Sequence, residues 1–287
     1  MRVARLALGL AQEALPRYAH PKSPHRFTCP QLAACVLLMI YLNKSSRDME
    51  EWLLATDAVC AVLALRQVPD HSTLSRALKR LRLRDLDAMR LALLADLPVT
   101  EDVIALDSTG YRRTQASAYY QSRRGTTFRS WGKGVYAVGA ASQLILAWRQ
   151  GRGPAIDSPY LNGLRRDARR YGRYRGRERQ WLLVADMGFD GRGVQDGDLI
   201  PPVRRHGTLV APARRARADP VAAARLDGVY GQRWKCETVH SVIKRKTGDT
   251  IRSRLPRNRR LEPVLKGLVY NLHRLTRTPP AGGTDTH

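Results

Sequence analysis

The chain has 287 residues, and its 50 lysines and arginines outnumber its 25 acids, which gives a formal net charge of +25. Because 43% of the residues are hydrophobic, the composition predicts a folded core and excludes a disordered basic tail. Arginines gather in many separate segments, which favours a phosphate-bearing partner, with a merely basic surface as the alternative. Nucleic acid is therefore the expected substrate.

Cysteine usage and apolar runs exclude two further classes of protein. The four cysteines form no Cys-x-x-Cys pair and have no histidine at zinc-ligand spacing, so we expect inert thiols in a reducing compartment. The longest apolar run, 33–42, is too short to span a bilayer, and no signal-peptide core follows the N-terminal arginines. We therefore expect a cytoplasmic protein, associated with the nucleoid, that has no membrane partner.

The first part of the chain, residues 1–98, is predicted to be a helical domain. Apolar residues recur there at helical spacing, without the shorter period of strands. A Pro turn and capping residues at 68–73 predict the start of one helix, and Pro98 ends the region. The predicted helices cover 31–42, 48–55, 58–65, a segment that begins near Ser72, and 85–97.

From Glu101 onward, short apolar runs replace the helical pattern. The predicted strands cover 103–107, 135–141, 144–148 and 181–185. The second and third form a hairpin across a tight turn at Ser142 and Gln143. The predicted helices cover 157–171, 226–246 and 261–275, with Gly228 and Gly231 as candidate interruptions of the second. Asp157 caps the first of these helices, and residues 279–287 are expected to fray. This order predicts an α/β fold in which a mixed sheet is flanked by helices on both faces.

Three acids stand out against the basic background. Asp107 and Asp186 each end a buried apolar run, where a carboxylate is better placed to point into a cleft than to pack. In such sheets, ligands collect at the carboxyl ends of the strands. As an alternative, Asp107 can cap the turn at 108–110. Asp186 can likewise form an Asx turn before Gly188.

The third acid, Glu237, lies on a predicted helix that has one chemical face and one packing face. At about 100° per residue, its polar residues fall within roughly 60° of one another, and its aliphatic residues fall on the opposite side. The polar set is Tyr230, Arg233, Glu237 and Lys244, and the aliphatic set is Val239, Val242 and Ile243. A solvated charged stripe is the alternative, but the two strand-end acids elsewhere favour a functional site. The lone His240 is expected to be structural.

Carboxylates without histidine or cysteine partners are hard oxygen ligands, and such ligands favour Mg²⁺ or Mn²⁺. Asp107, Asp186 and Glu237 together can hold two ions. Two ions about 4 Å apart activate a water and stabilise the leaving oxygen in an in-line phosphoryl displacement. The expected chemistry is therefore the cleavage or transfer of a phosphodiester.

The Glu237 helix also carries a complete family signature. The spacing Tyr-x2-Arg-x3-Glu-x6-Lys is present at Tyr230, Arg233, Glu237 and Lys244. It resembles the signature of the DDE transposases encoded by bacterial and archaeal insertion sequences. The segments that begin at Asp107 and Asp186 resemble the two aspartate motifs of that family, and 68–73 resembles its N-terminal helix start. The resemblance extends over about residues 30–275.

The resemblance implies a ribonuclease-H-like catalytic core over 99–278, preceded by a region for DNA binding or dimerisation over 1–98. Asp107, Asp186 and Glu237 would then be the catalytic residues and the ligands of two Mg²⁺ or Mn²⁺ ions. The implied partners are double-stranded DNA, as terminal inverted repeats and as target, and a second copy of the chain in a homodimer. Freed 3′-hydroxyls at the element ends would attack the target DNA.

The resemblance also implies particular DNA contacts. Tyr230, Arg233 and Lys244 would hold the DNA near the cut, because Arg binds phosphate in a bidentate way and Lys binds it as a point charge. Trp234 can stack on a displaced base or pack in the core. Several basic segments would follow the DNA backbone: Arg112-Arg113, Arg123-Arg124, Arg129 with Lys133, Arg214-Arg215-Arg217, and Arg252 to Arg260.

Two alternatives explain many of the same features. One is a metal-dependent nuclease of the same fold that only hydrolyses DNA. The other is a non-catalytic DNA-binding protein derived from a transposase. Some relatives carry a β-rich insertion that supports a hairpin intermediate on the excised DNA end, and the segment between Asp186 and Glu237 is too short to contain one. Transposition with and without a DNA hairpin are therefore both left as alternatives.

Overall fold

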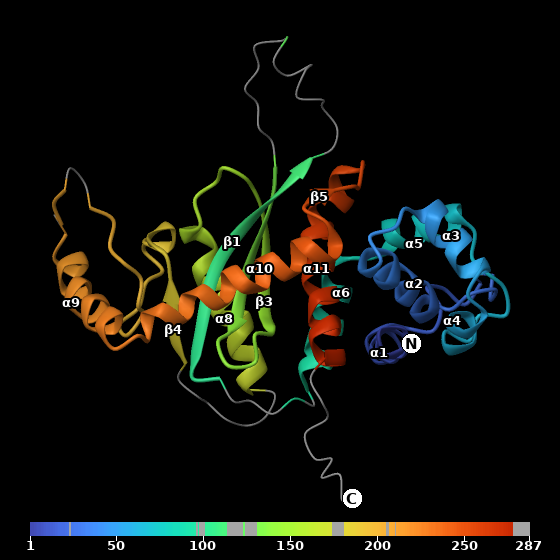
Figure 1. Ribbon diagram of the computed structural model, residues 1–287, viewed down its shortest axis with the longest axis horizontal. Helices are drawn as coiled ribbons and strands as arrows, with labels where there is room; N and C mark the ends of the chain where they lie inside the picture. The colour runs from blue at the N-terminus through green and yellow to red at the C-terminus, as the bar shows by residue number, and fades with distance from the viewer. Residues whose placement is uncertain are drawn as a thin grey trace, which may run out of the picture. The chain divides into compact units, whose positions relative to one another are not determined.

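The computed structural model describes residues 1–22, 24–95, 97, 101–113, 123, 131–173, 181–204, 207–209 and 211–277, with 171–173 as backbone only (Figure 1). The chain folds into two compact units, one from residues 1–92 and the chain end from Leu265, the other from residues 93–264. The predicted boundary between 98 and 99 and the tail 279–287 lie outside the described residues and stay predictions. Within the described ranges, no helix has the length and apolarity needed to cross a membrane.

The first unit is built from helices whose starts follow local capping rules. Its helices are α1 (Arg2–Ala14), α2 (Cys29–Tyr41), α3 (Ser46–Leu54), α4 (Asp57–Val62), α5 (His71–Arg80), most of α6 (Leu83–Ala95) and the last part of α11 (Pro256–Arg277). Thr28 and Ser45 cap α2 and α3, each through a capping box. Asp70 caps α5 by accepting a hydrogen bond from the Thr73 N–H at 2.7 Å, which confirms the predicted helix start.

The core of the first unit is centred on α2. Residues Ala33–Met39 are buried without a break, and α1 and α5 pack against this helix. On α5, Leu74 and Ala77 are buried, whereas Arg76 and Lys79 are exposed. The amphipathic pattern of the sequence therefore places one basic face of α5 at the surface of the unit.

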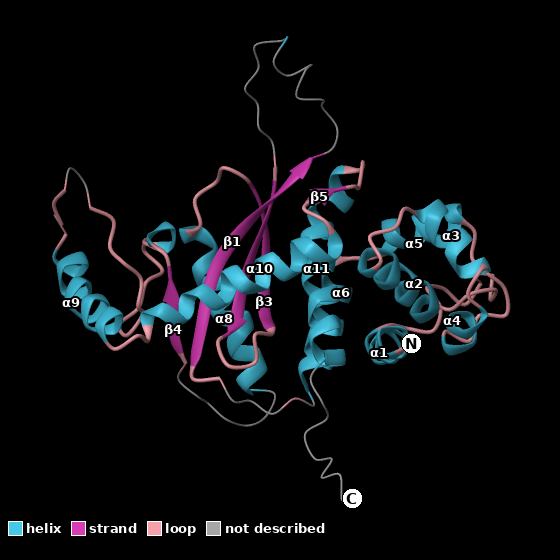
Figure 2. Ribbon diagram, in the orientation of Figure 1, coloured by secondary structure: helices cyan, strands magenta, loops and turns pink. Residues whose placement is uncertain are grey.

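In the part of the chain that the structure describes, the second unit contains a mixed sheet of five strands (Figure 2). The strands are β1 (Val103–Arg113), β2 (Gly132–Gly139), β3 (Ile145–Arg152), β4 (Leu182–Ala185) and β5 (Thr250–Ile251). Four lie in the order β3-β2-β1-β4, and β5 pairs with the end of β1. β1 is antiparallel to β2 and parallel to β4 and β5, and β2 and β3 form the predicted hairpin. This arrangement is consistent with a ribonuclease-H-like domain.

Helices cover both faces of this sheet. They are the 3₁₀ turns η1 (Ser158–Tyr160), η2 (Met187–Phe189) and η3 (Tyr230–Arg233), the helices α8 (Leu161–Arg173), α9 (Pro212–Leu226) and α10 (Trp234–Thr247), and the first part of α11. Because side chains alternate along β1, Asp107 and Tyr111 point to α10, whereas Ser108 points to the segment before α8. Figure 1 shows α10 crossing in front of the sheet. The prediction of helices on both faces is therefore confirmed.

Two elements differ from the prediction. β1 runs on to Arg113, so Asp107 lies inside this strand and not at its end; the extra residues pair with β2 and β5, which are distant in the sequence. The helix predicted over 226–246 is not continuous, because it is interrupted at Gly228, the first of its two candidate interruptions. α9 ends at Leu226, and Gly228 then adopts a φ of +80°, a left-handed conformation that glycine favours and that ends helices.

Candidate active site

The parallel pairing of β1 with β4 brings the two aspartates together. The register of paired residues ends at Leu106 and Ala185, and Asp107 and Asp186 follow directly on the two strands. Neighbouring strands lie about 4.8 Å apart, so the two acids lie side by side where the pairing of β1 with β4 ends. The Asp186 carboxylate accepts a hydrogen bond from the Gly188 N–H at 3.0 Å, as its Asx-turn alternative predicts.

Glu237 reaches the same region from α10, through Arg233. Arg233 Nη2 donates to Glu237 Oε1 at 2.6 Å, and Arg233 Nη1 lies 3.8 Å from Asp107 Oδ2. The guanidinium therefore bridges two of the three proposed catalytic acids. Tyr230 donates its hydroxyl to the carbonyl oxygen of Ala185 at 3.2 Å, directly before the second aspartate. Three residues of the signature thus gather around the aspartates.

The Asp107 carboxylate lies in an unfavourable environment for its charge. Burial raises the pKa of Asp107 from 3.8 to about 6, and the charges of Asp186 and Glu237 add to this effect. A hydrogen bond from the Ser108 N–H to Asp107 Oδ1 at 2.8 Å and the charge of Arg233 act in the opposite direction. Three acids therefore share one electrostatic environment, although the chain as a whole carries a charge of +25.

Two further side chains of α10 lie on the buried side of Asp107. His240 Nδ1 is 3.6 Å from Asp107 Oδ2. Burial, followed by the charges of Lys244 and Arg233, lowers the pKa of His240 from 6.5 to about 3, so its ring is neutral at pH 7. Burial and the charge of Asp107 raise the pKa of the Cys236 thiol well above its ordinary value. The sequence signal for His240 was its position one turn after the helical glutamate.

A fourth acid, Asp157, lies beside the site, and its predicted role as a helix cap is wrong. It precedes η1, but its side chain makes no capping hydrogen bond. Asp157 Oδ2 instead accepts from Ser108 Oγ at 2.8 Å, and Oδ1 pairs with Lys133 Nζ at 2.9 Å. The charge of Lys133, a predicted DNA contact, is thus used within the protein. A Cβ atom on Gly188 would lie 3.1 Å from Asp186 Oδ1 and 3.7 Å from Asp157 Oδ2, so both carboxylates border the same space.

Two predicted DNA-contacting residues of α10 have different surroundings. Trp234 is 51% exposed, and Lys235 Nζ lies 4.1 Å from its ring centroid, so the alternative of a core tryptophan is wrong. Lys244 is half-buried near the end of α10, with its Nζ 6.0 Å from the ring centroid of Tyr111. Base stacking stays a prediction for Trp234.

The pairing of β1 with β5 brings two of the predicted basic segments together. Arg112 and Arg113 lie at the end of β1 that pairs with β5. Arg112 forms an ion pair with Asp249. Burial, followed by the charges of Arg259 and Arg152, lowers the pKa of Arg113. Positive charge therefore accumulates at this end of the strand, six residues beyond the first aspartate.

Of the other predicted basic residues, two are engaged by an acid and two lie outside the described residues. Arg214 Nε and Arg217 Nη2 each lie 2.7 Å from a carboxylate oxygen of Asp190. Arg124 and Arg129 lie outside the described residues. The DNA contacts of all these segments stay predictions.

The donor set suits a hard divalent cation. Carboxylate oxygens are the ligands that Mg²⁺ and Mn²⁺ prefer, and a bound cation would relieve the repulsion among Asp107, Asp186 and Glu237. Among the described residues, no three acids, histidines or cysteines are close enough to form a complete ligand group as they stand. Because Arg233 bridges Glu237 and Asp107, it competes with a cation for both carboxylates.

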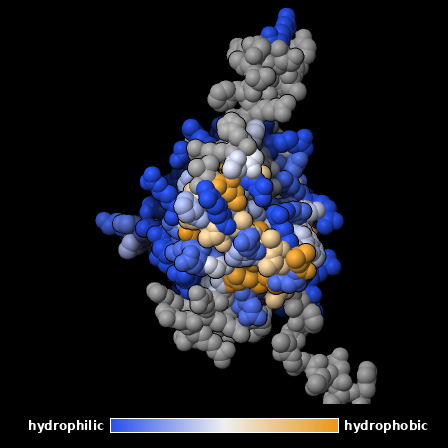
Figure 3. All heavy atoms as spheres, turned by 90° about the vertical axis from the view of Figure 1, so that its left-hand side faces the viewer, coloured by the Kyte–Doolittle hydropathy of each residue, from blue (hydrophilic) through white to orange (hydrophobic). Residues whose placement is uncertain are grey.

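The surface on the β4 and α9 side of the molecule is shown in Figure 3. It is largely hydrophilic, and apolar side chains gather near the centre of the view. Among the exposed apolar residues of this unit, Met187 directly follows the second aspartate and is 61% exposed. Leu226 is 92% exposed at the end of α9. Polar surface with a few apolar side chains is compatible with a partner that carries both phosphates and bases.

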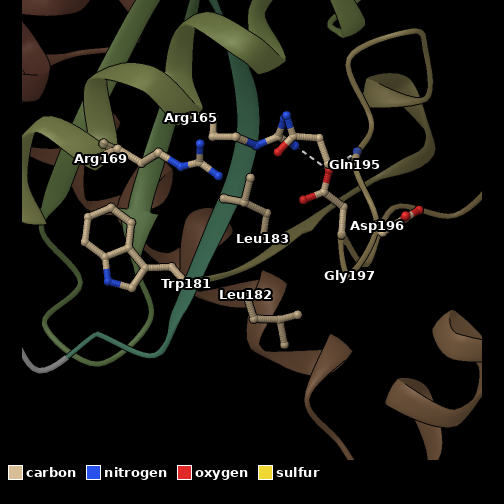
Figure 4. Close-up of a pocket in the computed structure, with 10 residues that line it drawn as sticks. Arg165, Arg169, Trp181, Leu182, Leu183, Gln195, Asp196 and Gly197 are labelled. Carbon is tan, nitrogen blue, oxygen red and sulfur yellow. Dashed lines mark hydrogen bonds and ion pairs between the residues drawn. The ribbon is translucent and has the colours of Figure 1, made fainter. Parts of the chain in front are cut away.

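A cavity of about 260 Å³ lies away from the acids (Figure 4). Its wall includes Leu182 and Leu183 at the start of β4, whereas Asp186 follows the end of that strand. Arg165, also in the wall, is buried and forms an ion pair with Asp198. None of the three proposed catalytic acids lines this cavity.

A mixed sheet flanked by helices, with two acids on neighbouring parallel strands and a third on a facing helix, is typical of nucleases and transposition enzymes. A family model described as "Transposase DDE domain" matches residues 98–272. The chain therefore belongs to the DDE transposase family, whose members act on DNA and generally use divalent metal ions. No curated protein matches the sequence.

Proposed function

We propose that this transposase binds the ends of a bacterial or archaeal insertion sequence, cleaves the DNA there, and joins the freed 3′-hydroxyls to target DNA. The observation that carries the proposal is the convergence of three acids from distant parts of the chain: Asp107 and Asp186 follow the paired ends of two parallel strands, and Arg233 bridges Glu237 to Asp107. Burial, and the charges of Asp186 and Glu237, raise the pKa of Asp107 to about 6. A protein that only bound a polyanion would gain nothing from such repulsion, whereas perturbed acids are common at catalytic sites.

The three acids would hold two Mg²⁺ or Mn²⁺ ions. When bound, these ions supply an activated water and stabilise charge on the phosphodiester oxygens. The chain itself orients the aspartates, because one oxygen of each accepts a backbone hydrogen bond. The donors are the N–H of Ser108 at 2.8 Å and the N–H of Gly188 at 3.0 Å. Both carboxylates are therefore held in place before any ligand binds.

The signature residues and the helical N-terminal region would bind the DNA. Arg233 and Lys244 would contact phosphates near the cut, with Tyr230 beside them, and the exposed ring of Trp234 would stack on a displaced base. The N-terminal helices would recognise the terminal inverted repeats. Two ends must be brought together for joining, so the active form would be a homodimer on DNA in the nucleoid.

The test uses a labelled duplex that carries the element's own end, taken from the DNA that flanks the gene, with a supercoiled plasmid as target. With Mg²⁺ or Mn²⁺, the wild type should cut at the element boundary and join the 3′ end to the plasmid. Glu237→Gln should lower both reactions by roughly 10³-fold or more. Asp219→Asn makes the same change of charge at an exposed position of α9 and should leave both reactions unchanged.

The possible outcomes separate the proposal from its alternatives. Cutting without joining would replace it with a metal-dependent nuclease. Specific binding of the end, with no cutting by either protein, would favour a DNA-binding protein derived from a transposase. Equal cutting by the wild type and Glu237→Gln would reject the catalytic role of Glu237.

A further inference from the structure

His240 is held rigidly next to the first aspartate. Its side chain is 9% exposed, and its ring centroid lies 5.6 Å from that of Tyr136, the residue opposite Asp107 in the pairing of β1 with β2. Tyr136 is itself fixed, because its hydroxyl is hydrogen-bonded to the hydroxyl of Tyr111 at 2.9 Å and to the carbonyl oxygen of Pro263 at 2.8 Å. The imidazole therefore has little freedom to turn away from the acid.

The two ring nitrogens of His240 have very different surroundings. Nδ1 lies 3.6 Å from Asp107 Oδ2, whereas Nε2 is buried and has no hydrogen-bond partner among the described residues. A neutral imidazole carries one N–H, on either nitrogen. Leaving a buried N–H without an acceptor forfeits the hydration of that group without replacement, so the proton belongs on Nδ1, where it faces a carboxylate.

We propose that His240 is a positioning residue for Asp107. Its Nδ1 faces Asp107 Oδ2 at 3.6 Å, a polar contact slightly longer than a hydrogen bond, while the Ser108 N–H donates to Oδ1 at 2.8 Å. The carboxylate is thereby kept in the orientation in which it receives a divalent cation, and each oxygen retains a lone pair for that cation. This role rests on the proposed function of Asp107 as a metal ligand. Outer-shell polar partners of a ligating group typically change metal affinity by about 10–100-fold.

A histidine that served only to fill the core would behave differently on substitution. His240→Phe keeps a ring against Tyr136 and removes the unsatisfied Nε2, so it should leave the unfolding temperature unchanged or raise it. It also removes the donor to Asp107. His240→Asn loses the ring but places an amide N–H near the position of Nδ1, so it should lower the unfolding temperature while keeping the donor.

The experiment is calorimetric titration of Mn²⁺ into the full chain, together with thermal unfolding, for the wild type, His240→Phe, His240→Asn and Asp107→Asn. His240→Phe should weaken Mn²⁺ binding about tenfold without loss of stability. His240→Asn should bind within about threefold of the wild type although it is less stable. Mn²⁺ affinity would thus fall in one variant and stability in the other, which a role in packing alone cannot produce.

Three results would overturn the proposal, and they are distinguishable. If Asp107→Asn weakens Mn²⁺ binding but His240→Phe binds as tightly as the wild type, Asp107 keeps its role and His240 has none. His240 also has no positioning role if Mn²⁺ affinity falls only in His240→Asn, the less stable variant. If the wild type shows no Mn²⁺ binding that depends on Asp107, the proposed metal site fails, and the role of His240 fails with it.

Discussion

Two buried acids of the same unit, Asp107 and Asp190, differ in how the fold treats their charge. Asp190 is paired with Arg214 and Arg217, each at 2.7 Å, and its side chain is 1% exposed. Burial by itself raises the pKa of Asp190, but the bonds from Arg217 and the Val203 N–H outweigh it and hold the pKa below 3.8. Asp190 is therefore a well-compensated structural acid that ties α9 to the loop after β4.

Asp107 is compensated much less. It accepts a hydrogen bond from the Ser108 N–H, but Arg233 is 3.8 Å away and the neutral ring of His240 is 3.6 Å away. Its pKa is raised to about 6 by burial and two neighbouring acids. The fold can neutralise a buried acid with close arginines and does so at Asp190. The difference supports the proposed role of Asp107 as a cation ligand, and the same Asp→Asn substitution at the two positions tests it.

The largest effect is expected at the structural acid. Asp190→Asn removes the charge between Arg214 and Arg217 and should lower the free energy of unfolding by about 4 kcal/mol at neutral pH. Because the folded pKa is depressed, this stabilisation is present above the unfolded value of 3.8 and is lost as the pH falls through the folded value. Urea unfolding measures it. Asp219→Asn, on the exposed face of α9, is the control and should change stability by less than about 0.5 kcal/mol.

At the proposed catalytic acid the sign should reverse. Asp107→Asn removes a destabilising charge and should raise the free energy of unfolding at neutral pH by up to about 3 kcal/mol. The folded pKa of about 6 exceeds the unfolded value of 3.8, so protonation favours the fold. The stabilisation that protonated Asp107 contributes to the wild type is fully present below the unfolded pKa of 3.8. It is lost as the pH rises through the folded pKa of about 6. The gain in Asp107→Asn should therefore vanish near about pH 4. A loss of stability at neutral pH would contradict the comparison.

Much of this arrangement depends on neighbouring residues and is therefore predictable from the sequence. Apolar runs precede Asp107 and Asp186, a short turn joins the hairpin strands, and capping residues begin the helices of the first unit. The break after α9 also has a local signal in Gly228, a predicted candidate interruption of that helix. In each case the energetic preference lies within a few residues.

The remainder depends on contacts between distant segments. β1 continues past Asp107 because residues 108–113 pair with β2 and β5, although this polar stretch resembles a turn locally. Asp157 has the local appearance of a helix cap, but its partners Ser108 and Lys133 are 49 and 24 residues away. No local rule brings those residues to its carboxylate, so only the folded sheet reveals that a fourth acid borders the site.

The smallest effect tests whether the weak compensation of Asp107 can be exchanged for a cation. Arg233 bridges Asp107 and Glu237, so Arg233→Gln should tighten Mn²⁺ binding to the DNA-free protein about fivefold, or about 1 kcal/mol. Loss of any nearby positive charge also attracts cations, and Arg225→Gln controls for this. Its guanidinium carbon lies 5.1 Å from the ring centroid of Tyr230, and this variant should tighten binding less than about twofold. Equal tightening in both variants, measured by calorimetry, would show a general charge effect and not competition for the two carboxylates.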